Sequence, residues 1–307
     1  MKPDETPRRT GLARALSKLG YCSRSQAAAL IRTGRVRLNG RVRLDPETPV
    51  HLDRDRIAVD EQAIEREERI YLMMNKPRGV LTTASDEQGR NTVYSLLNDA
   101  CSSGKGKNLQ GSLPWVAPIG RLDKASEGLL LLTNDSEWGS RVAAPETHLE
   151  KTYHVQIGIV ADDKLVQALV RGVKNDEGDT LSAKQARVLR SGQKNCWLEI
   201  ILDEGKNRQI RRMLAALGVD VLRLVRVGIG TLPLGNLAKG EFRPLTKDEK
   251  ESLDRAMNGN EPVHRSREAA QECSPRRKPW GGEGVVEKPR RGERKSVPQT
   301  SGDNAPR

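Results

Sequence analysis

The 307-residue sequence is poor in the side chains on which many enzymes and small secreted proteins depend. It holds four cysteines, four histidines and only 3% aromatic residues. The cysteines, at positions 22, 101, 196 and 273, form no C-x-x-C pair, and no histidine stands near them at ligand spacing. This scatter argues against a zinc site or a disulfide framework, so we expect reduced thiols and no bound metal.

Long apolar segments are missing as well. No run approaches the ~18 residues that a membrane helix requires. The first five residues, MKPDE, lack the apolar core of a signal peptide. We therefore expect a cytoplasmic protein without a membrane partner.

Nucleotide-binding loops are also lacking. The glycines around Lys105 do not belong to a G-x-x-x-x-G-K-[ST] loop. Gly228 and Gly230 do not continue into a dinucleotide fingerprint, because Pro233 stands where the third glycine would be needed. No nucleotide cofactor is indicated.

Positive charge, by contrast, is abundant. The sequence has 53 Lys+Arg against 41 Asp+Glu, a formal net charge of +12. Residues 8–56 alone carry twelve basic and four acidic side chains, which gives 12 − 4 = +8. Such a balance indicates a polyanionic partner, and nucleic acid is the first candidate.

The charged segment has the pattern of a small folded module at residues 10–60. Apolar residues at helical spacing predict a helix that Gly20 ends and a second helix that Ser23 caps and Gly34 ends. Asn39 and Gly40 then form a typical two-residue hairpin turn between two short strands. The pattern predicts two helices and a β-hairpin.

The basic residues of this module are candidates for binding phosphates, although a run of charges is also compatible with a merely solvated face. The candidates are Arg14, Lys18, Arg24, Arg32, Arg35 and Arg37.

The module resembles the alpha-L RNA-binding motif, named after the fourth small-subunit ribosomal protein. The resemblance rests on the spacing of its leucines, on GYCSR at residues 20–24 and on GRVRLNG at residues 34–40. It departs at Gly11, where the motif usually has arginine. It implies recognition of the shape of structured RNA.

A charged linker at residues 61–69 separates the module from a second domain, expected at residues 70–250. Strand patterns outnumber helices there without regular β-α-β alternation, so we expect an α+β domain with a mixed, mostly antiparallel sheet. Residues 251–307 are expected to form a disordered basic tail. An exposed loop is expected at about residues 101–113.

One stretch of the second domain stands out as a candidate active site. The segment GRLDKASEG at residues 120–128 runs directly into four leucines, so a charged, glycine-bounded turn feeds a buried strand. Asp123 is its candidate catalytic group, although an aspartate in a turn is often only a cap. A glycosidase-like reaction would need a second carboxylate, for which Glu127 or Asp135 is available.

Several motifs in the same order resemble the bacterial ribosomal RNA pseudouridine synthases that carry an alpha-L module. They are MNKPRG at residues 74–79, GRLDKASEGLLLLTND at 120–135, KTY at 151–153 and EGKNRQIRRM at 204–213. Ser126 departs from the threonine usual in the family but keeps the hydroxyl group.

The resemblance implies that a uridine of ribosomal RNA is isomerised to pseudouridine without a cofactor or metal. Asp123 would be the essential carboxylate, and Arg211 would pair with it because a guanidinium orients a carboxylate and favours its ionised form. Tyr153 would stack on the flipped base. Further RNA contacts are expected from Lys76, Arg121, Arg208 and Arg212, of which Lys76 could equally be solvated.

Alternatives remain open at the level of the sequence. The substrate is expected in large-subunit RNA, with small-subunit RNA as the alternative. A noncatalytic RNA-binding or ribosome-assembly protein is a second possibility. An RNA methyltransferase is a third, but a glycine-rich methyl-donor loop after a strand is missing. We expect a monomer.

Overall fold

The computed structural model describes residues 9–84, 88–102, 113–175 and 177–259. The predicted tail from residue 260 onward and most of the predicted 101–113 loop lie outside these ranges. None of the helices in the described ranges has the length and apolar character needed to cross a membrane.

The N-terminal module forms around two helices and short strands. Ser23 caps the second helix as predicted: its hydroxyl accepts a hydrogen bond from the Gln26 amide, and the Gln26 side chain accepts one from the Ser23 amide. Asn39 and Gly40 have φ angles of 52° and 79°, as a tight hairpin turn requires. The elements are β1 (Thr10–Gly11), α1 (Leu12–Lys18), α2 (Arg24–Arg32), β2 (Val36–Leu38), β3 (Arg41–Val42), β4 (Pro49–Val50), β5 (Ile57–Val59) and β6 (Gln62–Ala63).

The strands of the module extend beyond the predicted boundary at residue 60. Sheet order is β3-β2-β5-β6, and β6 pairs with β5 through Ala58 and Ala63. The first residues of the predicted linker therefore belong to this sheet. Their charged sequence shows no alternation because β6 is only two residues long and exposed.

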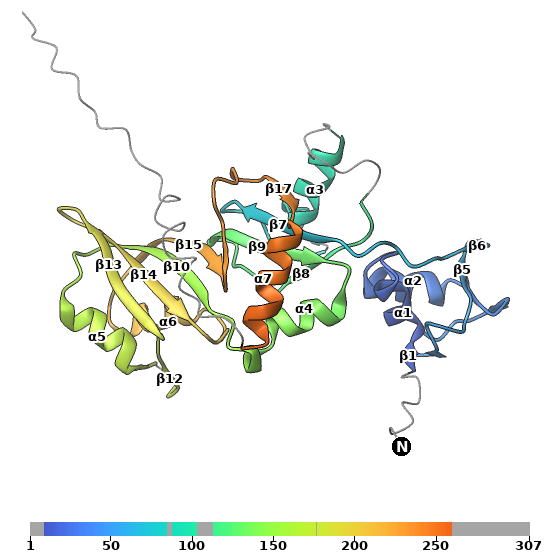
Figure 1. The fold of residues 1–307 in the computed structure, drawn as a ribbon, viewed down its shortest axis with the longest axis horizontal. Coiled ribbons are helices and arrows are strands. Elements are labelled where there is room, and N and C mark those ends of the chain that lie inside the picture. The colour runs from blue at the N-terminus through green and yellow to red at the C-terminus, as the bar shows by residue number, and fades with distance from the viewer. Residues whose placement is uncertain (1–8, 85–87, 103–112, 176, 260–307) are drawn as a thin grey trace, which may run out of the picture. The chain divides into compact units, whose positions relative to one another are not determined.

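A nine-stranded mixed sheet forms the second domain (Figure 1). Its order is β13-β14-β10-β15-β9-β7-β17, with β16 on β15 and β8 on β9. Among the strands that the structure describes, β9 and β15 are the parallel neighbours in this sheet, and the other pairs are antiparallel. The predicted α+β fold is confirmed.

The elements of this domain follow in chain order. They are β7 (Tyr71–Lys76), α3 (Val93–Ser102), β8 (Ala117–Ile119), β9 (Glu127–Thr133), α4 (Ser136–Ala143), the 3-10 helix η1 (Pro145–Thr147), β10 (Lys151–Ile157), α5 (Asp163–Arg171), β11 (Val173–Lys174), β12 (Thr180–Leu181), β13 (Gln185–Ser191), β14 (Cys196–Leu202), α6 (Gln209–Ala216), β15 (Val221–Ile229), β16 (Leu232–Pro233), β17 (Phe242–Pro244) and α7 (Lys247–Met257).

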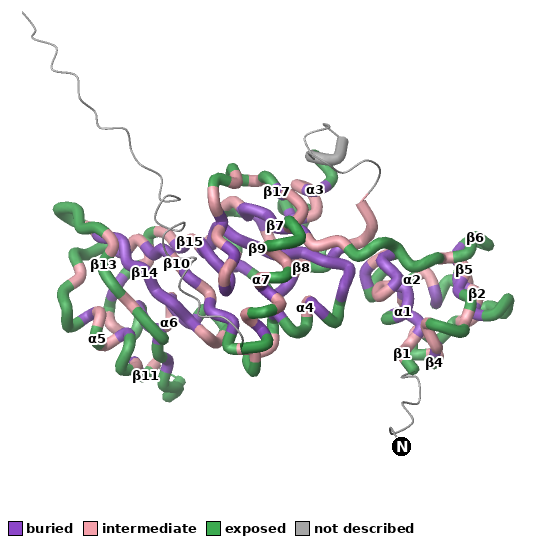
Figure 2. Tube along the Cα trace, in the orientation of Figure 1, coloured by how far each residue is buried: buried purple, intermediate pink, exposed green. Residues whose placement is uncertain are grey.

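The four consecutive leucines lie in β9, which is buried along its whole length (Figure 2). Because side chains alternate along a strand, Leu129 and Leu131 pack in one core with α4 and α7, while Leu130 and Leu132 pack in another with α3. A third core, beneath β10 and β14, is covered by α5 and α6.

Helix α7 corrects the predicted start of the tail. It runs to Met257, and its residues Leu253 and Met257 are buried against β9 and β16. The helix was missed because its sequence is mostly charged, and only its two buried positions show which side faces the core.

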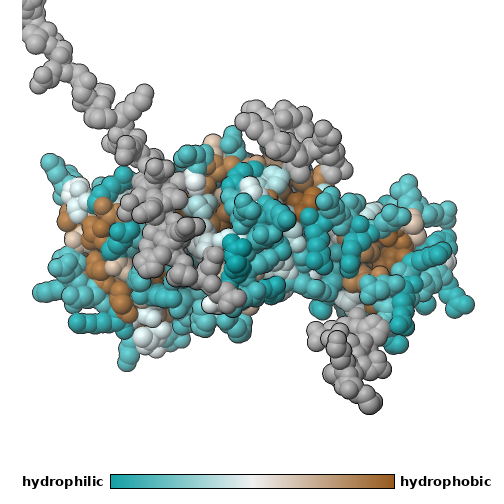
Figure 3. All heavy atoms as spheres, in the orientation of Figure 1, coloured by the Kyte–Doolittle hydropathy of each residue, from teal (hydrophilic) through white to brown (hydrophobic). Residues whose placement is uncertain are grey.

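The described surface is mainly hydrophilic on the face in Figure 3, with hydrophobic patches that include the region of α5 and β13. Val170 of α5 and Val188 of β13 are among its exposed apolar side chains.

Candidate active site

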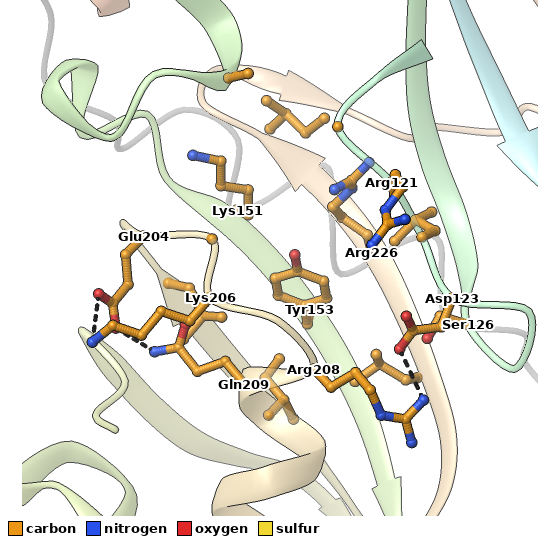
Figure 4. Close-up of a pocket in the computed structure, with 18 of the residues that line it drawn as sticks. Arg121, Asp123, Ser126, Lys151, Tyr153, Glu204, Lys206, Arg208, Gln209 and Arg226 are labelled. Carbon is orange, nitrogen blue, oxygen red and sulfur yellow. Dashed lines mark hydrogen bonds and ion pairs between the residues drawn. The ribbon is translucent and has the colours of Figure 1, made fainter. Parts of the chain in front are cut away.

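An open pocket of about 220 Å³ lies on the nine-stranded sheet at the loop before β9. Its walls come from this loop, from β10, from β15 and from the segment that leads into α6. Figure 4 shows its polar side chains turned toward the same space. The polar and charged side chains that line it are Arg121, Asp123, Ser126, Lys151, Tyr153, Glu204, Lys206, Arg208, Gln209, Arg211 and Arg226.

Asp123 lies on the loop between β8 and β9, at the edge of this pocket. Its backbone carbonyl accepts hydrogen bonds from the Ser126 amide at 2.9 Å and from the Lys76 Nζ at 3.2 Å. Thr82 Oγ1 donates to the preceding carbonyl, that of Leu122. The backbone is thus held on several sides, while the carboxylate remains about one third exposed. A fixed backbone with an accessible carboxylate suits a reacting group.

Two arginines flank the Asp123 carboxylate. Arg211 Nε, the predicted partner, lies 4.0 Å from Asp123 Oδ2 and has no hydrogen-bond acceptor, and Arg208 lies closer, at 3.6 Å. Their surroundings differ: the Arg211 side chain is 17% exposed and donates to the Ala125 carbonyl, whereas that of Arg208 is 53% exposed. Burial, together with the charge of Arg208, lowers the pKa of Arg211. Arg211 is therefore the more buried partner, held by a backbone carbonyl, and Arg208 the more exposed one.

Tyr153 lies on β10 with its ring in the pocket (Figure 4). The side of the ring away from solvent packs on the core beneath β10. A half-buried aromatic ring in an open pocket provides a surface for stacking a planar base.

Lys76 corrects a prediction. The side chain is fully buried, and its ammonium group donates to the carbonyls of Pro77, Asp123 and Ser126 at 2.9–3.2 Å. Burial lowers the pKa of Lys76 to about 8. A buried lysine with three internal acceptors does not contact RNA, and its position shows that it supports the Asp123 loop instead.

Both predicted candidates for a second catalytic carboxylate have structural partners. Glu127 is 3% exposed, and its carboxylate pairs with Arg223 and Lys239 at 2.6 Å. Asp135 caps α4 and accepts a hydrogen bond from the Tyr71 hydroxyl at 2.9 Å. Neither lines the pocket, so the geometry does not support a glycosidase-like carboxylate pair.

Arg121 and Arg212 were predicted together but lie in different surroundings. Arg121 is exposed and lines the pocket. Arg212, on α6, pairs with Glu177 and, at 2.9 Å, with Asp179, and it is not among the lining residues. Its position gives no support to an RNA contact at the pocket.

The basic candidates of the N-terminal module are largely at its surface. Arg14, Arg24 and Arg32 are exposed on the two helices. Arg35 is exposed as well but pairs with Asp60, and the half-exposed Arg37 pairs with Glu61 at 3.3 Å. The helix residues are therefore more available for an external anion than the two strand residues.

Sequence reasoning missed Lys151 and Arg226 as pocket residues. Lys151 precedes Tyr153 by two positions and so shares its face of β10, which was a usable signal. Arg226 lies within an apolar strand pattern and reaches the pocket only through the pairing of β15 with β10. Within the described ranges, no three His, Cys, Asp or Glu side chains gather in a way that could hold a metal ion.

Comparisons with known proteins agree with this geometry. Residues 70–216 match the model of the RNA pseudouridylate synthase family, and residues 10–57 match the S4 domain. The chain is 35% identical over 244 residues to ribosomal large subunit pseudouridine synthase B of Bacillus subtilis, covering 79% of this chain and 94% of the relative.

Two further matches have similar sequence identity and coverage of this chain. An uncharacterized RNA pseudouridine synthase of Aquifex aeolicus is 34% identical, with 79% of this chain and 92% of the relative covered. A crystal structure of a pseudouridylate synthase is 31% identical, with a TM-score of 0.52, covering 80% of this chain and 99% of that one. With an N-terminal S4 domain followed by the synthase domain, the chain belongs to the RNA pseudouridine synthase family.

Proposed function

We propose that the protein converts a specific uridine of large-subunit ribosomal RNA into pseudouridine, with Asp123 as the essential carboxylate. The observation that carries this proposal is the position of Asp123, which lies in an open pocket between Arg208 and Arg211. The choice of large-subunit RNA is supported by the name of the Bacillus subtilis relative.

The reaction requires the target base to leave its helical stack, which costs a few kcal/mol. Tyr153 compensates part of this cost by stacking on the flipped uracil. The bond between N1 and the sugar C1′ then breaks beside the Asp123 carboxylate, which attacks C1′ or stabilises its positive charge. The base turns within the pocket and rejoins the sugar through C5.

Arg211 orients the Asp123 carboxylate. Its guanidinium donates to the Ala125 carbonyl, which lies on the same loop as Asp123. Arg208 and Arg121, both exposed at the pocket, contact the phosphates on either side of the flipped nucleotide.

Most of the binding free energy for RNA comes from the N-terminal module. Its exposed helix residues Arg14, Arg24 and Arg32 contact phosphates of a structured RNA segment, whereas the half-buried Lys18 pairs with Glu137 at 3.5 Å. These contacts offset the cost of base flipping.

The test is the Asp123→Asn variant, which keeps the size of the side chain and removes its charge. We expect pseudouridine formation to fall by at least about 10³-fold, because the reacting carboxylate is lost, while RNA affinity stays within about threefold. Pseudouridines are mapped in both ribosomal RNAs from cells with and without the protein. Full activity of the variant would contradict the role of Asp123, and a difference confined to small-subunit RNA would reassign the substrate.

A further inference from the structure

Two basic side chains share one side of the pocket and have no role in the mechanism above. Tyr153 of β10 is paired in register with Arg226 of β15, and Lys151 lies two residues before Tyr153. Side chains opposite each other on antiparallel strands, and those two apart on one strand, share a face of the sheet. Lys151, Tyr153 and Arg226 therefore surround the same part of the pocket, as Figure 4 shows.

Arg226 is held rigidly and still has an unused donor. Its Nε donates to the Leu129 carbonyl on β9 at 2.7 Å, which fixes the guanidinium. The side chain is only 6% exposed, and its second terminal nitrogen, Nη2, is buried without a hydrogen-bond partner. A buried cationic donor without an acceptor is costly, so its retention in a pocket wall indicates that an acceptor arrives with the ligand.

Lys151 is the second unpaired cation. Among the residues that the structure describes, no carboxylate lies within 4.0 Å of its ammonium group or of the Arg226 guanidinium. Glu204, the acidic residue on this side of the pocket, is occupied by Lys206 and Gln209. Burial and the charge of Arg226 lower the pKa of Lys151, while Asp203 partly offsets them.

The reaction of this family creates negative charge near these two groups. When the bond between N1 and C1′ breaks, the electron pair stays with the base and spreads over the ring and its two carbonyl oxygens. The sugar carbon is left electron-poor beside Asp123. Fixed donors aimed at such developing charge are a strong source of rate enhancement in a site shielded from water.

We propose that Lys151 and Arg226 donate hydrogen bonds to the carbonyl oxygens of the detached uracil and stabilise its negative charge, an inference that rests on the proposed function. The electron pair that the base receives from the N1–C1′ bond later forms the C5–C1′ bond. C5 then loses its proton and N1 gains one, so atoms and charge balance without another reactant. The two cations also hold the base while it turns on Tyr153.

Burial favours the base over an RNA phosphate as the acceptor. A phosphodiester group belongs to a continuous backbone that must pass along the mouth of the pocket, where Arg121 and Arg208 are exposed. Arg226, in contrast, is almost completely buried, donates to the Leu129 carbonyl of β9 and lines the pocket. A flipped base enters that space, whereas a backbone phosphate does not.

The first experiment separates binding from reaction. Lys151→Met and Arg226→Met are compared with wild type for RNA affinity and for the single-turnover rate at saturating RNA, on the ribosomal RNA that the wild type modifies. We expect each variant to lose about 10²-fold in rate, with affinity within about threefold. Lys174→Met, an exposed lysine on β11, is the matched control and should behave as wild type.

The second experiment separates charge stabilisation from a structural role. Lys151→Arg and Arg226→Lys should regain much of the lost rate. An RNA with 6-azauridine at the target, whose detached base is a more stable anion, should reduce the defect of the Met variants by about tenfold. Thermal unfolding monitors the fold, and the partly exposed Lys151 provides a readout if Arg226→Met does not fold.

Four outcomes would overturn the inference. Weaker RNA binding with a normal saturated rate would mean that the cations bind phosphate. An equal defect with uridine and 6-azauridine would mean that they only maintain structure. A wild-type protein without activity on any ribosomal RNA would refute the proposed function and this inference with it, whereas an active wild type with fully active variants would refute the inference alone.

Discussion

The basic side chains of the N-terminal module and those of the pocket differ in their exposure. Arg14, Arg24 and Arg32 are exposed on the module's helices, whereas Lys76 and Arg226 are almost completely buried in the synthase domain. An exposed cation can bind a phosphate at little desolvation cost, but a buried one must satisfy its donors inside the protein. The comparison supports the proposal that the exposed residues bring RNA to the enzyme and the buried ones organise the reaction.

The largest expected effect is a loss of stability when a buried carboxylate with two basic neighbours loses its charge. Glu199 is 3% exposed and lies 2.6 Å from Arg187 and 3.6 Å from His154. Burial alone would raise the pKa of Glu199, but the nearby His154 and the hydrogen bond from Arg187 outweigh it and bring the pKa down from 4.5 to about 2. This difference corresponds to about 3 kcal/mol of stability at neutral pH.

Because the folded pKa is the lower one, this contribution is complete above about pH 4.5 and is lost as the pH falls toward 2. We expect Glu199→Gln to reduce the free energy of unfolding by about 3 kcal/mol at pH 7 and by much less at pH 3, as measured by urea unfolding. Glu251→Gln, which removes an exposed partner of Lys247, should change it by less than about 0.5 kcal/mol. If the two variants lost equal free energy of unfolding, burial would not determine how much a charged side chain contributes to stability.

The second prediction concerns Lys76, which the sequence analysis placed among the RNA-contacting residues although it is buried. Lys76→Met removes a donor from the carbonyls of Pro77, Asp123 and Ser126, of which Asp123 keeps the Ser126 amide, and so loosens the Asp123 loop. We expect the saturated rate of pseudouridine formation to fall by about 10²-fold, with RNA affinity unchanged within about threefold. Weaker RNA binding with a normal saturated rate would mean that Lys76 contacts RNA after all.

The smallest effect is expected for a single charge change in the N-terminal module. Arg24→Gln removes one exposed charge at the start of α2, so RNA affinity should fall by about three- to tenfold at physiological salt. The slope of log affinity against log salt should decrease by about one, and the saturated rate should not change. Lys174→Gln serves as the control, and an altered saturated rate in Arg24→Gln would mean that the module takes part in the reaction.

Local patterns allowed much of the fold to be predicted. The capping box of Ser23, the hairpin turn at Asn39 and the buried strand after Gly128 each depend on neighbouring residues, so the sequence contains the whole signal. Helix α7 was cut short because its signal lies in two buried positions among charged ones.

The residues of the pocket were predicted only in part, because contacts between segments far apart in the sequence determine which side chains line it. Asp123, Tyr153 and Arg211 were found through motifs and do line one pocket. Lys76 was misplaced because its acceptors at Asp123 and Ser126 lie 47 and 50 residues away along the chain. Arg226 was overlooked because its position in the pocket depends on strand pairing with β10.

Gly128 joins the two sides of this pocket. It has φ +104°, and a Cβ atom there would lie 2.2 Å from the Arg226 carbonyl oxygen, in the parallel contact between β9 and β15. Only glycine permits this approach, which places the strand after the Asp123 loop beside the strand that carries Arg226. The glycine of the motif is thus a requirement of sheet assembly and not of catalysis. During evolution, a descendant that lost Asp123 and its activity would still be selected to keep Gly128 for as long as it kept this fold.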